Sequence, residues 1–194
     1  MTADPHTSTE NPAAAPSGAP RAVHPPPLRR SAWTPRQRAV RLIWMFLGGV
    51  LWRLLPPFRG QLLRFFGATI GARCSFARTV RIDVPWNLRI GDDVQVRAHA
   101  ILYALGPITI GERSIIDRYA HLCAGSHDFT DPRFPLTRPP ITLGKRCLVG
   151  LDAYIGPGVT LGDDVAVHPR ASVHRDFPSD SNLAGNPARS IEGR

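Results

Sequence analysis

The sequence is poor in cysteine: it holds only three, Cys74, Cys123 and Cys147, among 194 residues. Their spacing is irregular, and there is no CxxC pair or His/Cys pattern typical of a metal site. This excludes the disulfide framework that holds many small secreted domains together. A reducing cytoplasm is the simplest compartment for such a chain, and we expect each cysteine to be a small buried residue.

Long hydrophobic runs are also lacking. The stretch 42–55 is apolar apart from Arg53, but its fourteen residues fall short of the roughly 20 needed to cross a bilayer. No apolar segment follows the first residues, as a secretory signal would require. A spanning helix is therefore the least favoured interpretation, and we expect no secretion.

Acidic residues are scarce in the first third of the chain. Residues 1–66 hold nine arginines against Asp4 and Glu10, a net charge of +7, whereas residues 67–194 hold fourteen arginines, one lysine and thirteen acids, a net charge of +2. The positive charge thus belongs to an arm beside a near-neutral domain. No recognisable nucleic-acid-binding module accompanies it, so we expect no nucleic-acid partner.

The first third divides into two segments. Residues 1–34 hold seven prolines and almost no large apolar side chains, which predicts a disordered tail. Residues 35–66 predict a basic, amphipathic helical segment. Thr34 before Pro35 is a typical helix start, with an N-cap residue ahead of a proline at the first helical position. Two further prolines at 56–57 are expected to end the first helix.

Two interpretations of this helical segment stay open. The helix could pack against the following domain or against a neighbouring subunit. Alternatively, it could lie at a membrane surface, with Trp44, Phe46 and Trp52 in the lipid boundary and arginines at anionic headgroups. The second interpretation would make the protein peripherally membrane-associated, at the inner face of the cell membrane.

From Ile70 onward, a large apolar residue recurs every six positions through fifteen units, with short insertions between some of them. It is aliphatic in fourteen units and Phe in the other. The fifth position is usually small or β-branched, and Gly often follows the first, where we expect it to relieve a bend at a corner. A period of six fits neither an α-helix nor an alternating strand. It is typical of a parallel β-helix, and the all-β domain at 67–194 is predicted to have about five triangular coils of three units each.

The repeat is interrupted once, after His127, and resumes at Leu143. The intervening residues 128–142 contain four prolines and predict a stiff loop that protrudes from a corner of the coil. His127 is the last residue before this loop and occupies the sixth position of its unit, which points outward. An outward histidine at the root of a protruding loop is a candidate functional residue.

The region 67–194 resembles the hexapeptide-repeat acyltransferases. The closer resemblance is to the colanic-acid-type polysaccharide O-acetyltransferases, which are similar to the galactoside and maltose acetyltransferases. It rests on five motifs: FFGATIG at 65–71, VPWNLRIGDDV at 84–94, LGPITIG at 105–111, CAGSHDFTDPRF at 123–134 and AGNPARSI at 184–191. The resemblance implies a left-handed β-helix, a homotrimer with sites between two subunits, acetyl-CoA as co-substrate, and no metal. It also implies a sugar-hydroxyl acceptor, on an exopolysaccharide or a lipid-linked glycan intermediate.

By the same resemblance, His127 is the catalytic base. It would take the proton from the acceptor hydroxyl as that oxygen attacks the acetyl carbonyl, with no acyl-enzyme intermediate. Histidine suits this task because its ordinary pKa lies near neutrality. A histidine that only anchors the loop is the alternative interpretation.

The other candidates are less specific. Asp128 could orient the imidazole or bind a sugar hydroxyl, or it could cap the loop as an Asx turn. Where related enzymes carry a substrate-binding Asn, this chain has none, so the acceptor candidates are Arg97, His99 and Tyr103. Coenzyme A and the oxyanion are assigned, from the resemblance, to four residues: Gly150 and Leu151 through their backbone N–H groups, and the cations Arg175 and Arg189. At 167–172 this chain has the run VHPRAS, where related enzymes often have a run of small residues along the pantetheine groove.

Two alternatives belong to other functional classes. A β-helix could be a non-catalytic assembly module, since a fold alone does not determine function. It could also be a γ-carbonic-anhydrase-like enzyme, which needs three histidines around Zn²⁺. His99, His121 and His127 are present, but their spacing does not match that metal set.

Overall fold

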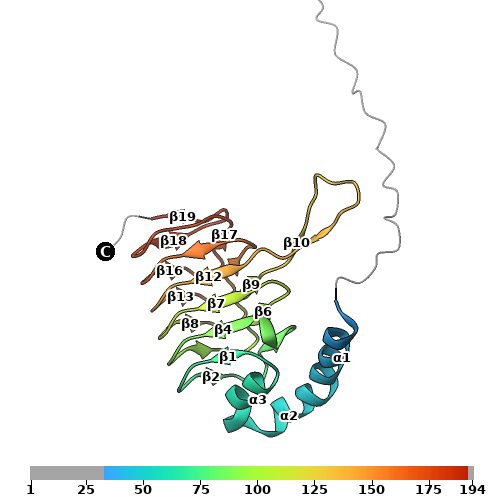
Figure 1. Cartoon of the computed structure of the whole chain (residues 1–194). Helices are drawn as coiled ribbons and strands as arrows, with labels where there is room; N and C mark the ends of the chain where they lie inside the picture. Colours follow the sequence, from blue (N-terminus) through green and yellow to red (C-terminus); the bar gives the residue numbers. More distant parts are fainter. Residues whose placement is uncertain (1–32, 192–194) are drawn as a thin grey trace, which may run out of the picture.

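The computed structural model describes residues 33–191, which form a triangular stack of short parallel strands with helices at one end (Figure 1). The tail predicted to be disordered, 1–34, lies outside the described residues except for its last two. The chain visits three sheets in turn, here named A, B and C, and returns to the first. Each sheet forms one face of the stack, and the three junctions between sheets are its corners.

Each strand contains only two or three residues. Sheet A contains β1 (Thr69–Ile70), β4 (Leu88–Ile90), β7 (Ile108–Ile110), β12 (Ile141–Leu143) and β15 (Thr160–Leu161). Sheet B contains β2 (Ser75–Phe76), β5 (Gln95–Val96), β8 (Ile115–Ile116), β13 (Leu148–Val149), β16 (Ala166–Val167), β18 (Asn182–Ala184) and the antiparallel β19 (Arg189–Ser190). Sheet C contains β3 (Arg81–Ile82), β6 (Ile101–Tyr103), β9 (His121–Cys123), β14 (Tyr154–Ile155) and β17 (Ser172–Val173).

The core is the column of residues at the first position of each unit. In sheet C, for example, Leu102 pairs with Leu122, and both side chains are fully buried. Because successive coils stack in register, each aliphatic residue covers the one beneath it, and burial of such a side chain stabilises the fold by about 1.5–3 kcal/mol. The parallel β-helix is thereby confirmed. Sheet B has six parallel strands rather than five, because β18 adds a partial coil that the count of hexapeptides did not include.

The role expected for the corner glycines was wrong. Gly111 and Gly144 do not have the positive φ that a sharp bend would require; that conformation falls on non-glycine residues such as Arg113 and Arg146. Glycine is needed because the next coil lies against it. A Cβ on Gly111 would sit 2.4 Å from the carbonyl carbon of Gly144, so any side chain would force the coils apart.

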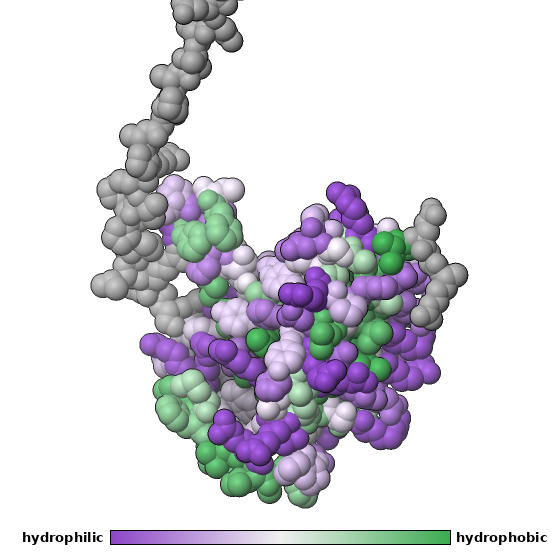
Figure 2. Space-filling model, turned by 180° about the vertical axis from the view of Figure 1, so that it is seen from behind, coloured by the Kyte–Doolittle hydropathy of each residue, from purple (hydrophilic) through white to green (hydrophobic). Residues whose placement is uncertain are grey.

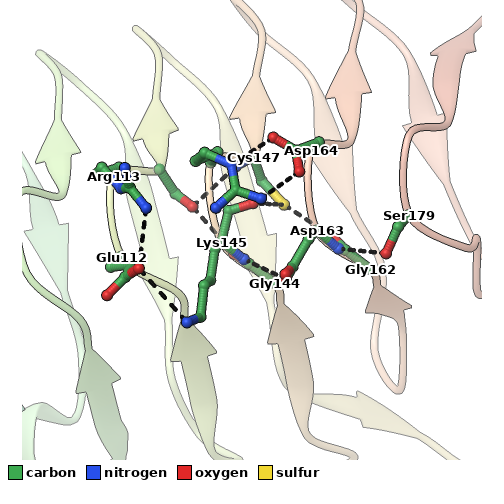
Figure 3. Close-up of polar contacts among 11 residues, drawn as sticks. Glu112, Arg113, Gly144, Lys145, Cys147, Gly162, Asp163, Asp164 and Ser179 are labelled. Atoms are coloured by element: carbon green, nitrogen blue, oxygen red, sulfur yellow. Dashed lines mark hydrogen bonds and ion pairs between the residues drawn. The ribbon is translucent and has the colours of Figure 1, made fainter.

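The corner between sheets A and B shows how polar side chains hold successive coils together (Figure 3). The Asp163 carboxylate accepts a hydrogen bond from the Lys145 backbone N–H at 2.8 Å, and the Ser179 hydroxyl accepts one from the Asp163 N–H at 3.0 Å. Arg146 pairs with Asp164 across the same two coils. These contacts satisfy corner N–H groups that no strand partner reaches.

Residues before the first coil form five short helical elements; the last of them lie at the end of the stack and the first stands beside it (Figure 1). They are α1 (Pro35–Ile43), a π-helical turn (Trp44–Gly48), α2 (Gly49–Leu54), a 3-10 turn (Pro56–Phe58) and α3 (Arg59–Phe65); a further 3-10 turn, Pro85–Asn87, precedes β4. The predicted helix start is confirmed: the Thr34 hydroxyl accepts from the Gln37 N–H, and the Gln37 amide oxygen accepts from the Thr34 N–H. The prolines that follow end the helix at Leu54, as expected.

Of the two interpretations left open for the helical segment, the membrane one predicted Trp44, Phe46 and Trp52 in lipid, and it is wrong for the two tryptophans, which pack against the following domain as the other interpretation expects. Trp44 and Trp52 are 7% and 5% exposed and belong to the core. Their indole N–H groups donate to the Ile82 carbonyl at 2.8 Å and to the Arg78 carbonyl at 3.0 Å. Both rings therefore fasten the helices to the first coil. Phe46, the third residue of that prediction, is 69% exposed.

Two arginines of the helical segment are likewise committed to the protein. Arg59 is buried and donates to the carbonyls of Trp52 and Phe76 at 3.0 and 2.8 Å. Arg64 donates to the Ile70 and Gly71 carbonyls at 2.9 and 2.7 Å. Neither is positioned for lipid headgroups. Within residues 33–191, none of the helices has the length and apolar character to cross a membrane.

Candidate active site

The predicted protruding loop is a β-hairpin at the corner between sheets C and A (Figure 1). Its strands are β10 (Ser126–His127) and β11 (Leu136–Thr137), which pair antiparallel, with His127 opposite Leu136. The hairpin leaves the stack after β9 and returns through Pro139 and Pro140 to β12. This places His127 at the root of the hairpin rather than at its tip.

Two contacts hold the His127 ring. Its Nδ1 lies 2.9 Å from the Phe134 carbonyl oxygen, and its plane stacks on the Phe134 ring at a centroid distance of 4.4 Å. A carbonyl can only accept, so Nδ1 carries the proton. In the neutral ring, Nε2 then holds the lone pair, which is the tautomer a general base requires. The side chain is half-buried.

The Asp128 carboxylate is hydrogen-bonded to Thr130 in the hairpin loop. Its Oδ1 accepts from the Thr130 N–H at 2.8 Å and from the Thr130 hydroxyl at 2.6 Å, which is an Asx-turn geometry. The Thr130 hydroxyl and N–H hold the pKa of the Asp128 carboxyl below its ordinary value. Of the three roles considered for this residue, the geometry favours the loop cap.

Tyr103 reaches the same corner from β6. A Cβ on Gly125 would lie 3.1 Å from the Tyr103 ring, so this glycine leaves room for the tyrosine beside the hairpin root. Tyr103 also makes an edge contact with His121 at 6.4 Å between centroids. Tyr103 is therefore the acceptor candidate that the structure places closest in the fold to the base of the hairpin.

An aromatic column on the outer face of sheet C was not predicted. His121 meets Tyr154 edge-on at 5.5 Å, and Tyr154 meets His174 at 5.5 Å. Burial, with the neighbouring Cys123, raises the pKa of Tyr154 to about 12. The signal was available: these rings all occupy outward positions flanking the core residue in the third unit of successive coils.

His121 predicts a pH dependence of stability. Burial lowers its pKa, partly offset by the Asp83 carboxylate, and Arg81 adds to the lowering; its Nε2 is buried without a hydrogen-bond partner among the described residues. The His121 ring therefore takes up a proton less readily in the folded protein than in the unfolded chain. Its neutral form contributes to the free energy of unfolding above about pH 6.5, and this contribution is lost as the pH falls through the folded-state pKa. His121→Phe should flatten the decline in denaturation midpoint between pH 8 and pH 5.5. An unchanged decline would contradict this assignment.

Arg97 and His99 lie on a different corner, between sheets B and C. Arg97 pairs with Asp117 at 3.2 Å, and His99 stacks on Tyr119 at 4.8 Å with a positive φ of 62°. Gly150 and Leu151 occupy the same corner two coils further on. The Gly150 N–H donates to the Val167 carbonyl at 2.8 Å, so in this structure it is occupied, and Leu151 is the remaining backbone donor of the two.

The predicted coenzyme A cations are also separated. Arg175 follows β17 at the His127 corner, two coils away, with its guanidinium over the Phe177 ring at 5.0 Å. Arg189 is exposed on β19, at the end of sheet B. In the unusual 167–172 run, the His168 ring contacts the Asn182 amide oxygen at 2.7 Å. Within one chain, the candidate residues for the base, the acceptor and coenzyme A thus lie at different corners of the β-helix.

The three histidines of the carbonic-anhydrase alternative do not converge. His99 is on the sheet B–C corner, His121 on the face of sheet C, and His127 on the hairpin. Among residues 33–191, no group of three or more His, Cys, Asp or Glu side chains is placed to hold a metal ion.

A parallel β-helix built on a six-residue period is the architecture of the hexapeptide-repeat proteins. A sequence profile described as the hexapeptide repeat of succinyl-transferase matches residues 140–168. WcaF of Escherichia coli (strain K12), named as a colanic acid biosynthesis acetyltransferase, is 40% identical over 142 residues, which cover 73% of this chain and 78% of WcaF. The chain therefore belongs to the hexapeptide-repeat acetyltransferases and is an acyltransferase.

Solved structures agree on the fold. An acetyltransferase from Vibrio cholerae O1 biovar eltor, solved with acetyl coenzyme A, matches with a TM-score of 0.77 at 22% identity, covering 84% of this chain and 92% of that one. A galactoside acetyltransferase in complex with coenzyme A matches with a TM-score of 0.76 at 22% identity, covering 84% of each chain.

Proposed function

We propose that this protein transfers an acetyl group from acetyl-CoA to a sugar hydroxyl, with His127 as the general base. The observation that carries the proposal is the His127–Phe134 hydrogen bond, which leaves Nε2 free of its proton at the root of the hairpin. The family membership and the names of the relatives support acetyl-CoA as donor. The relation to WcaF supports an acceptor in exopolysaccharide or lipid-linked glycan assembly.

The imidazole ring of His127 carries out both proton transfers of the reaction. Nε2 of His127 removes the hydroxyl proton as the sugar oxygen bonds to the acetyl carbonyl carbon. The tetrahedral intermediate then collapses, the carbon–sulfur bond breaks, and the imidazolium returns the proton to the departing thiolate. Because Nδ1–H stays bonded to the Phe134 carbonyl throughout, the ring keeps its orientation in both steps.

The site requires a second copy of the chain. His127, Tyr103 and Arg175 lie at the sheet C–A corner, whereas Arg97, His99 and Leu151 lie at the sheet B–C corner. In a homotrimer the C–A corner of one subunit can face the B–C corner of the next. The Leu151 N–H would then be a backbone donor for the oxyanion, and substrates held in this groove would gain the proximity contribution.

The Phe134 ring provides a test of positioning. Phe134→Leu removes the stacked ring but keeps the backbone carbonyl, and such ring contacts contribute about 0.5–1.5 kcal/mol. We expect kcat to fall about 2–10-fold, with the KM for acetyl-CoA unchanged and Phe134→Tyr close to wild type. Equal rates in wild type and Phe134→Leu would show that the stacking does not position the base.

The function itself is tested by thiol release from acetyl-CoA with a panel of free sugars and lipid-linked oligosaccharides. Acceptor-dependent release, with acetate recovered on the sugar, would establish the transferase. The non-catalytic alternative predicts no release with any acceptor and no coenzyme A binding by the full-length protein. We place the reaction in the cytoplasm, with the protein held peripherally at the inner face of the membrane.

A further inference from the structure

We propose that the helices before the first coil form a docking surface for an anionic phospholipid bilayer, in which a basic groove receives headgroup phosphates and an apolar face enters the acyl boundary. This proposal rests on the membrane location proposed above, but not on the transfer chemistry. The surface is distinct from the residues placed at the active site.

The apolar face consists of the helical side chains that the first coil does not cover. Successive turns direct Trp44, Gly48 and Trp52 into the protein, where all three are buried. The other sides of the same segment are also apolar, and ten of the fifteen exposed large hydrophobic side chains of the described chain lie here. They are Leu42, Ile43, Met45, Phe46, Leu47, Val50, Leu54, Leu55, Phe58 and Phe65.

This concentration is visible on the surface. In Figure 2 the hydrophobic colour gathers at the lower end of the molecule, over the helices, while the faces of the β-helix are mixed and mostly hydrophilic. A helix surface that carries this many apolar side chains is normally buried. Since the first coil covers one side only, the remaining sides need another apolar environment.

Beside this face lies a basic groove. It is a hollow of about 390 Å³ between the helices and the first coil, and four arginines line it against one acid, Asp83. The arginines are Arg41, Arg53, Arg78 and Arg81. Residues 33–66 contain six arginines and no Asp or Glu, so no charge within the helical segment neutralises this groove. Such a groove is complementary to phosphate groups.

The groove and the apolar face share an edge. Met45, Gly49 and Arg53 line the groove and also the shallow depression that contains Phe46 and Val50. Groups that bind phosphate thus lie directly beside groups that suit acyl chains. This is the arrangement of an amphipathic helix lying in a lipid interface. A second copy of the helical segment would instead bring the same acid-free, basic surface against itself, which like charges disfavour.

The position of the groove relative to the active site fits this role. Asp83 follows β3 in sheet C, and the hairpin with His127 leaves the same sheet after β9, two coils further along. Two strand spacings correspond to about 10 Å along the stack axis. Asp83 at the groove and the root of the hairpin therefore follow strands of the same sheet, only two strand spacings apart.

The test is co-sedimentation of the full-length protein with vesicles at low ionic strength. We expect binding to vesicles of phosphatidylglycerol and phosphatidylcholine, and little binding to phosphatidylcholine alone. Arg53→Gln combined with Arg81→Gln removes two groove charges and should weaken binding roughly 30-fold. Leu42→Ser combined with Phe46→Ser should weaken it at least as much.

Matched controls make the same kinds of change, loss of charge and loss of an apolar side chain, at positions away from the proposed docking surface. Arg89→Gln combined with Arg170→Gln removes two exposed arginines from the β-helix, and Leu148→Ser removes an exposed apolar side chain there. Both controls should bind within about twofold of wild type, apart from the small general effect of net charge. Equal losses in the control and groove variants would overturn the proposal.

Two other outcomes would also overturn it. If inorganic phosphate bound the groove but vesicles did not, the site would serve a soluble anion. If Leu42→Ser with Phe46→Ser changed the oligomeric state and wild type ignored anionic vesicles, the apolar face would be a contact between copies. Acetyl transfer to a water-soluble acceptor should be the same in wild type and both surface variants, so failure of docking and failure of the transferase are distinguishable.

Discussion

Replacing His127 by alanine is expected to lower kcat for acetyl transfer by about 10²–10⁴-fold, the range that a positioned general base contributes. The physical reason is the tautomer: the Phe134 carbonyl holds the proton on Nδ1 at 2.9 Å, so Nε2 is the atom that accepts the acceptor's proton. Thiol release from acetyl-CoA at saturating acceptor measures the effect. The KM for acetyl-CoA should be little changed, because the base acts on the other substrate.

His127→Gln separates catalysis from anchoring. The glutamine amide can still donate to the Phe134 carbonyl, but it cannot take up a proton. If His127 is the base, His127→Gln should be as inactive as His127→Ala, with the fold and oligomeric state of wild type. Activity restored by glutamine would instead show that the histidine only anchors the hairpin, and the search for a base would move to His121 or His99.

Replacing Trp44 by alanine is expected to destabilise the protein by about 3–5 kcal/mol, as for other large aromatic side chains in cores. The ring is 7% exposed, contacts Trp52 and Phe66 edge-on, and donates its indole N–H to the Ile82 carbonyl. Its loss opens a cavity and leaves a buried carbonyl without its donor. The midpoint of chemical denaturation, at fixed protein concentration, measures the change.

Phe46→Ala is the matched control, two residues along the same segment. This ring is 69% exposed, so its removal should change stability by no more than about 0.5 kcal/mol. A similar loss in both variants would mean that Trp44 has no special role in fastening the helices. Little loss in Trp44→Ala would mean that the helices and the first coil unfold independently.

The helical segment shows where sequence reasoning reached its limit. The cap at Thr34 and the stop after Leu54 depend on local chemistry, and both were predicted. Which side of the helix faces the protein depends on the partner surface, and the periodicity of an all-round apolar helix does not reveal it. The sequence therefore left two interpretations open, a packed helix and a membrane-surface helix; the first coil buries the tryptophans and leaves Phe46 and its neighbours exposed.

The candidate active site likewise combines features that the sequence predicted with features that only tertiary contacts decide. The interruption at His127 was visible because a β-helix must keep its register, so a break in a six-residue period marks a departing loop. The Phe134 contact was not predictable, because it depends on how the hairpin folds back across seven residues. The occupied Gly150 N–H likewise follows from stacking of the next coil, which spacing along one chain does not specify.

The sequence by itself determined the β-helix, its corners and the position of the hairpin, because in a solenoid each residue's environment follows from its place in the repeat. Only the tertiary structure decided which histidine nitrogen carries the proton, which side of the helices is buried, and how the candidate residues divide among the corners. Those properties depend on contacts between residues distant in sequence, and the one-dimensional period carries no information about such contacts.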